Sequence, residues 1–249
     1  LWRDRISARM CALVFATMGF PMVASNVVAT DFLLTSALAL THVCFWNAQR
    51  RGSLLMVYLT WFFLGIAFLT KGPPALLFLP AMVAVCRHRR REKSRQFGFF
   101  NPLAILLFLV VGFGWYVGEA SIHPGLAHYW LKDEVINRSF SNEFDRNSPF
   151  YKNFELYIPI LVFGTLPWSA WVAWRWRLIC GRLCRFVRIT ENWRNMSDAA
   201  VWLIWATVFP LVVFVLSHSK LPLYLLPLFV PIAVGMGRLL LQLDGAKPE

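Results

Sequence analysis

The sequence predicts an all-α fold, a polytopic bundle of about eight transmembrane helices. Hydrophobic residues make up 58% of the 249 positions and charged residues only 15%, a composition that is typical of membrane proteins. Long apolar runs recur along the whole chain, with charges mainly at their ends. No flexible linker, low-complexity tract or repeat divides them, so we treat residues 1–249 as part of one membrane domain.

Eight apolar runs are candidate membrane-spanning helices. A hydrocarbon core about 30 Å thick needs roughly 20 helical residues per crossing, and most runs come near this length. The fourth run is short, and we expect it to extend into the arginines that follow, whose long side chains reach the interface. The eight runs are Met10–Ala29, Phe32–Trp46, Leu54–Thr70, Pro73–Cys86, Pro102–Gly118, Phe154–Trp174, Ala199–Leu216 and Leu223–Leu240.

The basic residues distinguish the two sides of the membrane. If the amino end is cytoplasmic, inner segments hold 19 of the 25 lysines and arginines, as the positive-inside rule requires. The two most basic loops, Arg87–Arg95 and Arg175–Arg194, then both face the cytoplasm. The net charge of +12 therefore reflects membrane topology, and we expect no nucleic-acid partner.

Four segments remain on the outer, non-cytoplasmic side. Three of them are short and must hold their charges close to the helix ends. The long one, 119–153, mixes aromatic and basic residues after His123-Pro124-Gly125, which favours a helix lying in the interface. The short segments are Asn26–Asp31, Thr70–Pro74 and Ser217–Pro222.

Asp31 and Lys71 each allow a structural and a functional interpretation. Asp31 opens a predicted span and could serve as its N-cap. Lys71 precedes a proline pair that starts the next helix, and could be an anchor that reaches the headgroups. Ionisable groups at membrane helix ends also mark ligand sites, or pair with one another. A structural Asp31–Lys71 ion pair therefore remains an alternative.

Two further positions complete the outer set. Arg138, in the long segment, is either a solvated charge or a cation over the mouth of a pocket. Lys220 is followed four residues later by Tyr224, so one turn of helix would place both on one side. Several cations and one acid on the same face suit a phosphate-bearing lipid bound from the outer leaflet.

These residues and their order give the chain a resemblance to the GT-C lipid-linked sugar transferases, which include aminoarabinose transferases of lipid A and protein O-mannosyltransferases. The resemblance covers almost the whole chain. It rests on Thr30–Thr35, Leu69–Pro73, Trp115-Tyr116 with His123–Gly125, Glu134 with Arg138, Pro149–Tyr151, Leu166–Trp168 and Ser219–Pro227.

The resemblance implies a bacterial inner-membrane glycosyltransferase with a periplasmic active face. Such an enzyme moves a sugar, with inversion, from a polyprenyl phosphate to lipid A, a protein or another envelope acceptor. It implies that Arg138 and Tyr224 contact the donor phosphate, that Lys71 and Lys220 add positive potential, and that Asp31 orients the site. The alternative is a lipid-phosphate transporter or flippase that binds the same membrane lipid without glycosyl transfer.

Two departures from the family pattern bear on activity. The chain begins with Leu1 in a charged stretch that leads straight into a span, so we expect a fragment that lacks its N-terminal part. The main catalytic base is then expected upstream, and the segment alone is expected to hold an incomplete active site. Val135 stands where some aminoarabinose transferases carry a metal-linked histidine, so we assign no metal ligand and leave use of a divalent metal open.

Overall fold

The computed structural model describes residues 5–91, 98–130, 151–177, 179–180, 196–217 and 220–243. Every element in these ranges is helical, which confirms the predicted all-α class. The elements are, in order, α1 (Arg5–Thr17), α2 (Gly19–Ala24), α3 (Thr30–Arg51), α4 (Leu54–Lys71), η1 (Pro73–Phe78), α5 (Leu79–Arg91), α6 (Pro102–Ile122), α7 (Leu126–Tyr129), η4 (Asn153–Tyr157), α9 (Ile158–Phe163), α10 (Trp168–Trp174), α12 (Asp198–Leu216), η6 (Pro222–Leu228) and α13 (Phe229–Leu243).

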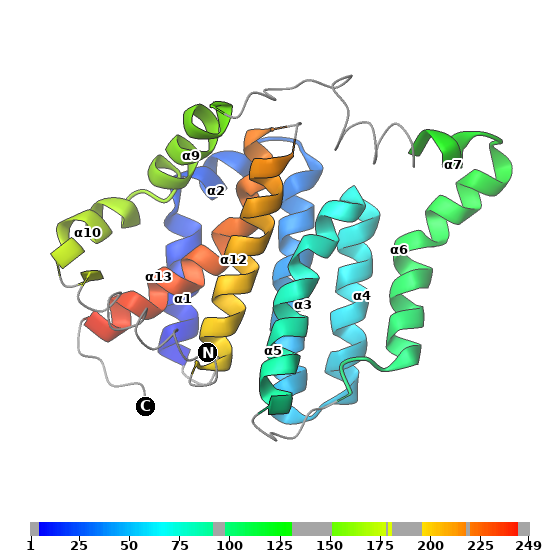
Figure 1. The fold of residues 1–249 in the computed structure, drawn as a ribbon, viewed down its shortest axis with the longest axis horizontal. Coiled ribbons are helices and arrows are strands. Elements are labelled where there is room, and N and C mark those ends of the chain that lie inside the picture. Colours follow the sequence, from blue (N-terminus) through cyan, green and yellow to red (C-terminus); the bar gives the residue numbers. More distant parts are fainter. Residues whose placement is uncertain are drawn as a thin grey trace.

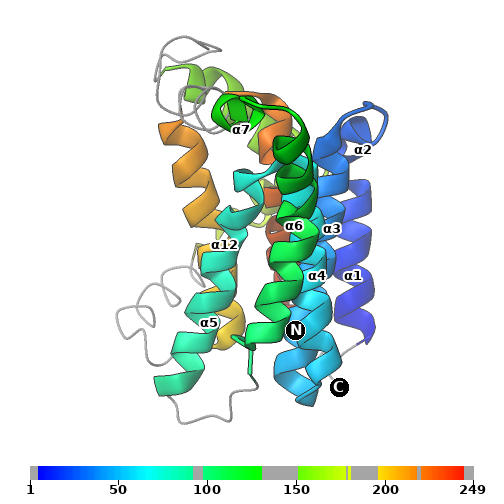
Figure 2. The same ribbon diagram turned by 90° about the vertical axis from the view of Figure 1, so that its right-hand side faces the viewer.

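The long helices form two layers. Helices α1, α3, α4 and α6 stand in a row, and α5 and α12 pack together on one side of it (Figure 2). Helix α13 runs obliquely across α1 and packs against it at the left-hand side of the bundle in Figure 1. This arrangement buries one stripe of each helix and leaves much of the apolar surface of α6 exposed, as expected where lipid or more protein covers it.

The connections alternate between the two ends of the bundle. The links α2–α3, α4–η1 and α6–α7 and the end of α12 lie at the upper end in Figure 1, and the link α3–α4 and the end of α5 lie at the lower end. The upper links are the segments that the charge count assigned to the outer side, so we call this the outer end. The predicted alternation of sides is therefore present in the fold.

Five of the eight predicted spans meet a test of length and apolarity within the described ranges. Four are single continuous spans: Leu54–Lys71, Pro102–Ile122, Asp198–Leu216 and Pro222–Leu243. The fifth is the pair Phe154–Phe163 and Trp168–Trp174, bent by 83°. The other three predictions correspond to α1 with α2, to α3, and to η1 with α5, which are helical but are broken or carry more polar residues.

Two helix breaks support each other. The first predicted span is interrupted at Met18, between α1 and α2, and the bent pair is interrupted at 164–167. The amide of Gly19 donates to Leu166 O at 3.0 Å, and the amide of Phe20 donates to Gly164 O at 2.9 Å. Backbone groups freed from helices inside a membrane need such partners, so the two breaks form one structural unit.

Buried aromatic residues fill the space between the two layers. Trp202 of α12 donates its indole N–H to His42 Nδ1 of α3 at 3.1 Å, and the same ring lies edge-on to Trp46 at 6.4 Å between centroids. Trp61 of α4 donates to Phe99 O at 2.8 Å, which holds the connection before α6. These contacts fix α3, α4 and α12 relative to one another and so position their outer ends.

Candidate active site

Asp31 lies inside the first turn of α3. The helix begins at Thr30, and the extended residue before it, Ala29, makes no side-chain cap. Asp31 is therefore not the N-cap that the sequence suggested. Asp31 is 6% exposed and lies close to the positive end of the helix. A buried carboxylate still requires a partner of opposite charge.

Lys71 supplies that partner. It is the last residue of α4, and Gly72, with φ 72° and ψ −136°, reverses the chain before Pro73 begins η1. The predicted turn and the predicted proline start are both confirmed. The Lys71 ammonium donates to Asp31 Oδ1 in an ion pair between largely covered side chains. The alternative of an Asp31–Lys71 ion pair is therefore realised in the structure.

Tyr224 covers the same ammonium group. Lys71 Nζ lies 4.7 Å from the centroid of the Tyr224 ring, within the range of a cation–π interaction. Tyr224 belongs to η6, which packs against α3 and α12, and its ring faces Phe214 of α12 with centroids 6.2 Å apart. Three segments that are distant in sequence thus meet at one ammonium group.

Lys220 lies close to Phe214 and Tyr224 in sequence, but its ammonium group has a different partner. It is 2% exposed and donates to Ser217 O at 2.8 Å. Because η6 begins only at Pro222, Lys220 stands outside the helix, and the predicted one-turn relation to Tyr224 is wrong.

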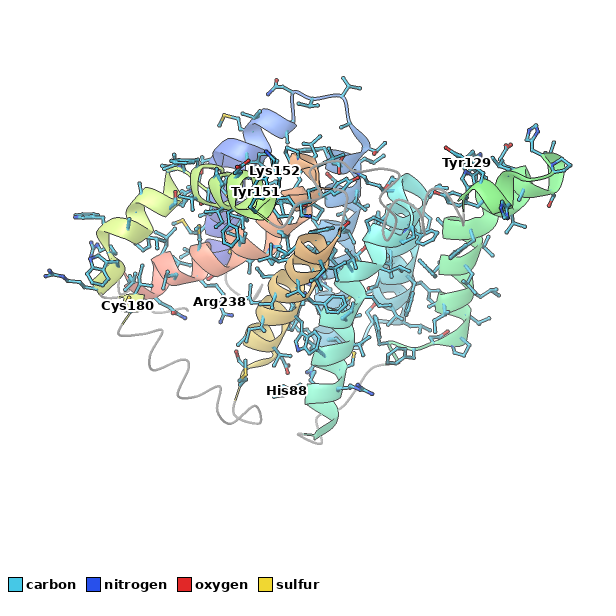
Figure 3. All side chains as sticks on the ribbon, turned by 45° about the horizontal axis from the view of Figure 1, so that its top comes forward. His88, Tyr129, Tyr151, Lys152, Cys180 and Arg238 are labelled. Atoms are coloured by element: carbon cyan, nitrogen blue, oxygen red, sulfur yellow. The ribbon has the colours of Figure 1, made fainter. Side chains whose placement is uncertain are left out.

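Arg138 and Glu134 lie outside the described residues, as does most of the predicted interfacial helix. The two described ends of the long outer segment are α7 and the turn that carries Tyr151 and Lys152, and they lie on opposite sides of the outer end (Figure 3). Lys152 donates to Glu155 Oε2 at 2.6 Å on the surface. This hydrogen bond and the charge of Glu155 raise the pKa of Lys152.

The sequence analysis missed Tyr157. It is 2% exposed, and its hydroxyl makes no hydrogen bond within the described part of the chain. Its element η4 packs against η6, which carries Tyr224. The available signal was a phenol at the start of an apolar run, directly before Ile158-Pro159. That signal alone does not distinguish a functional tyrosine from an interfacial one.

In the ranges that the structure describes, no three His, Cys, Asp or Glu side chains gather closely enough to hold a metal ion. Among the described residues, the groups gathered near Lys71 and Tyr224 at the outer end include a paired carboxylate and ammonium, and a second buried ammonium and a buried phenol lie on neighbouring segments. Such a set can bind and orient an anion such as a phosphate.

Fold and site together define a multi-pass helical membrane protein with a largely covered lysine–aspartate pair beside a tyrosine ring at one end of the bundle. A model of the family described as dolichyl-phosphate-mannose-protein mannosyltransferase matches residues 1–127. This is more than half of the chain, and the protein belongs to that family.

Curated relatives extend the similarity to nearly the whole chain. An undecaprenyl phosphate-alpha-4-amino-4-deoxy-L-arabinose arabinosyl transferase of Pseudomonas aeruginosa (strain UCBPP-PA14) is 31% identical over 97% of this chain and 42% of its own length. A relative of the same name from Enterobacter sp. (strain 638) is 30% identical over 98% of this chain and 42% of its own length. The chain thus spans about two fifths of the relatives it matches.

Two crystal structures share the fold. ArnT from Cupriavidus metallidurans bound to undecaprenyl phosphate superposes with a TM-score of 0.67 at 18% identity, covering 93% of this chain and 40% of that one. Its apo state gives a TM-score of 0.67 at 19% identity, covering 95% and 40%. The resemblance inferred from sequence is therefore confirmed, and the chain is part of a multi-pass protein of a bacterial inner membrane.

Proposed function

We propose that the complete protein is a glycosyltransferase that moves a sugar from polyprenyl phosphate to lipid A at the periplasmic face. The observation that carries the proposal is the Lys71 ammonium, held between the Asp31 carboxylate and the Tyr224 ring at the outer end. Membership of a family of lipid-phosphate sugar transferases supports the reaction type. The names of the relatives above favour aminoarabinose as the sugar and undecaprenyl phosphate as the carrier.

The reaction has a simple balance of bonds and charges. An acceptor oxygen attacks the sugar C1, a base takes the acceptor proton, and the bond between C1 and the phosphate oxygen breaks. The polyprenyl phosphate then leaves with one more negative charge than it carried in the donor. Cations and phenol hydroxyls beside the phosphate lower the barrier because they stabilise this developing charge more than the ground state.

Asp31 serves in this proposal as an orienting residue. Its carboxylate is already engaged by Lys71, which makes it a poor acceptor for the substrate proton. The ion pair is neutral overall. By family resemblance, Lys220 and Arg138 would add positive charge beside the phosphate. An ammonium has three N–H donors; one meets Asp31 and Tyr224 covers one side, which leaves Lys71 able to donate to a phosphate oxygen.

The segment 119–153 faces the periplasm in this proposal, and residues 1–249 form part of one larger membrane domain. The missing length of the relatives is expected to supply the main base and further acceptor contacts. Protein acceptors, which the family description names, are a second class of acceptor, and the experiment below separates them from lipid A.

The experiment uses the complete reading frame in bacterial membranes with labelled undecaprenyl-phosphate aminoarabinose. Transfer of label to lipid A is expected from the parent protein and is expected to fall strongly in Lys71→Met. The exposed Lys152→Met variant is the matched control, because it removes the same charge from the surface. Label in protein alone would replace lipid A by a protein acceptor. Movement of intact donor across the membrane without any glycosylated product would show a transporter and overturn the proposal.

A further inference from the structure

Tyr157 combines deep burial with an unused polar group. Tyr157 is 2% exposed, and its hydroxyl has no hydrogen-bond partner among the described residues. A buried hydroxyl without a partner is unfavourable, and most such groups in native proteins are satisfied. At the outer end, which holds the proposed site, a buried hydroxyl without a partner indicates a hydrogen-bond acceptor that a bound ligand would supply.

The backbone at Tyr157 is also unusual. Residues Asn153–Tyr157 form one turn of π-helix directly before α9. A π-turn is rare, because its hydrogen bonds are less favourable than those of an α-helix, and it occurs often at functional sites. Here it sets the rotation at which Tyr157 enters the bundle, while the exposed Phe154 and Ile158 on either side face outward.

The neighbours of Tyr157 are the residues of the proposed site. Its element η4 packs on η6, which carries Tyr224. Tyr224 in turn lies on the Lys71 ammonium, 4.7 Å from Nζ to the ring centroid. Tyr224 and Lys71 both keep some solvent access, so a ligand that enters beside them approaches the element that carries Tyr157.

We propose that the Tyr157 hydroxyl donates a hydrogen bond to the phosphate of the lipid bound beside Lys71 and Tyr224. Tyr157 is then a further substrate-binding residue of the outer site. The inference rests on the proposed function, because it takes the ligand to be a polyprenyl phosphate. A phenol suits this role, since it donates to an anion without adding a charge that the unliganded interior would have to neutralise.

The test is the isosteric variant Tyr157→Phe in the protein from the complete reading frame, purified in detergent. The measurements are the affinity for undecaprenyl phosphate and the thermal unfolding midpoint without ligand. Loss of a hydrogen bond to an anion should weaken affinity roughly 10- to 100-fold. The midpoint without ligand should stay the same or rise, because the variant removes a buried hydroxyl that has no partner. Tyr58→Phe, on α4 near the opposite end of the bundle, is the matched control and should change neither quantity.

Each outcome decides the inference. Unchanged affinity in Tyr157→Phe overturns it while leaving the proposed function intact. A lower midpoint without ligand also overturns it, because the hydroxyl would then have a partner within the protein. Undecaprenol, which lacks the phosphate, should bind the parent and Tyr157→Phe equally, and a weaker binding of this alcohol by the variant would contradict a phosphate contact. If the parent itself fails to bind undecaprenyl phosphate, the proposed function falls, and the inference falls with it.

Discussion

The Lys71 ammonium lies 4.7 Å from the centroid of the Tyr224 ring and pairs at the same time with the Asp31 carboxylate. Asp31 lies in the first turn of α3, Lys71 ends α4 and Tyr224 lies in η6, so one charged group joins three elements at the outer end. Both the electrostatics and the packing of this end therefore depend on Lys71. Variants of its partners Asp31 and Tyr224 can therefore separate the effect on stability from the effect on ligand binding.

Replacement of Asp31 by asparagine should destabilise the protein by about 3 kcal/mol, because it leaves a largely covered ammonium without its counter-ion. The combined swap Asp31→Lys with Lys71→Asp should recover much of the stability in thermal unfolding. It should not recover sugar transfer, because a carboxylate would then lie against the Tyr224 ring and repel phosphate. Breaking the exposed Lys152–Glu155 pair with Lys152→Met should leave unfolding unchanged. Full recovery of transfer in the swap would show that the pair is purely structural.

The contributions of the Tyr224 ring and of its hydroxyl can be measured separately with two variants. Tyr224→Phe keeps the ring over Lys71, so the unfolding midpoint should stay near that of the parent, while affinity for undecaprenyl phosphate should fall if the hydroxyl contacts the phosphate. Tyr224→Leu also removes the cation–π contact and should cost about a further 1 kcal/mol of stability. Equal stability and equal affinity in the two variants would exclude both roles. Thermal unfolding and lipid binding measured on the same preparations make the comparison.

The sequence predicted the local features of this site and missed the long-range ones. The turn at Lys71 followed from the adjacent Gly72 and Pro73. The ion pair with Asp31 was only one alternative, which the cost of charge near a membrane suggested. The contact between Lys71 and Tyr224 depends on how η6 packs between α3 and α12, which no local pattern encodes. The relation of Lys220 to Tyr224 failed because helical spacing was applied across the start of η6 at Pro222.

The same distinction holds for the fold. Apolar runs and charges predicted the class, the alternation of ends and five of the spans, because hydropathy reports directly on burial in lipid. The break between α1 and α2 was not predicted, since its freed amides at Gly19 and Phe20 are satisfied by Leu166 O and Gly164 O from a distant segment. Helix breaks inside a membrane depend on such partners, which are invisible in a single stretch of sequence.

Gly237 should be essential to the packing of α13 against α1. A Cβ at this position would lie 2.8 Å from Cys11 Sγ and 3.0 Å from Cys11 Cα. Gly237→Ala should therefore force the helices apart and destabilise the protein by about 1–3 kcal/mol. Gly114→Ala in α6 is the control: its Cβ meets nothing within 4 Å, and alanine favours the helix by about 0.5–1 kcal/mol. Thermal unfolding in detergent should thus shift in opposite directions, and a shared direction would contradict the packing argument.

The hydrogen bond between Trp202 and His42 should couple α12 to α3. His42 Nδ1 accepts the Trp202 indole N–H at 3.1 Å in the buried core, so His42→Leu leaves that donor unpaired and should cost about 1–3 kcal/mol. Trp202→Phe should cost a similar amount, and the double variant should lose less than the two single losses combined, with a coupling of about 1 kcal/mol. Trp46→Phe provides the comparison, because the Trp46 indole N–H makes no hydrogen bond with any described residue. Its removal therefore costs no hydrogen-bond energy. Unfolding in mixed micelles with increasing SDS measures all four variants, and strictly additive losses at His42 and Trp202 would show that the hydrogen bond contributes nothing to the bundle.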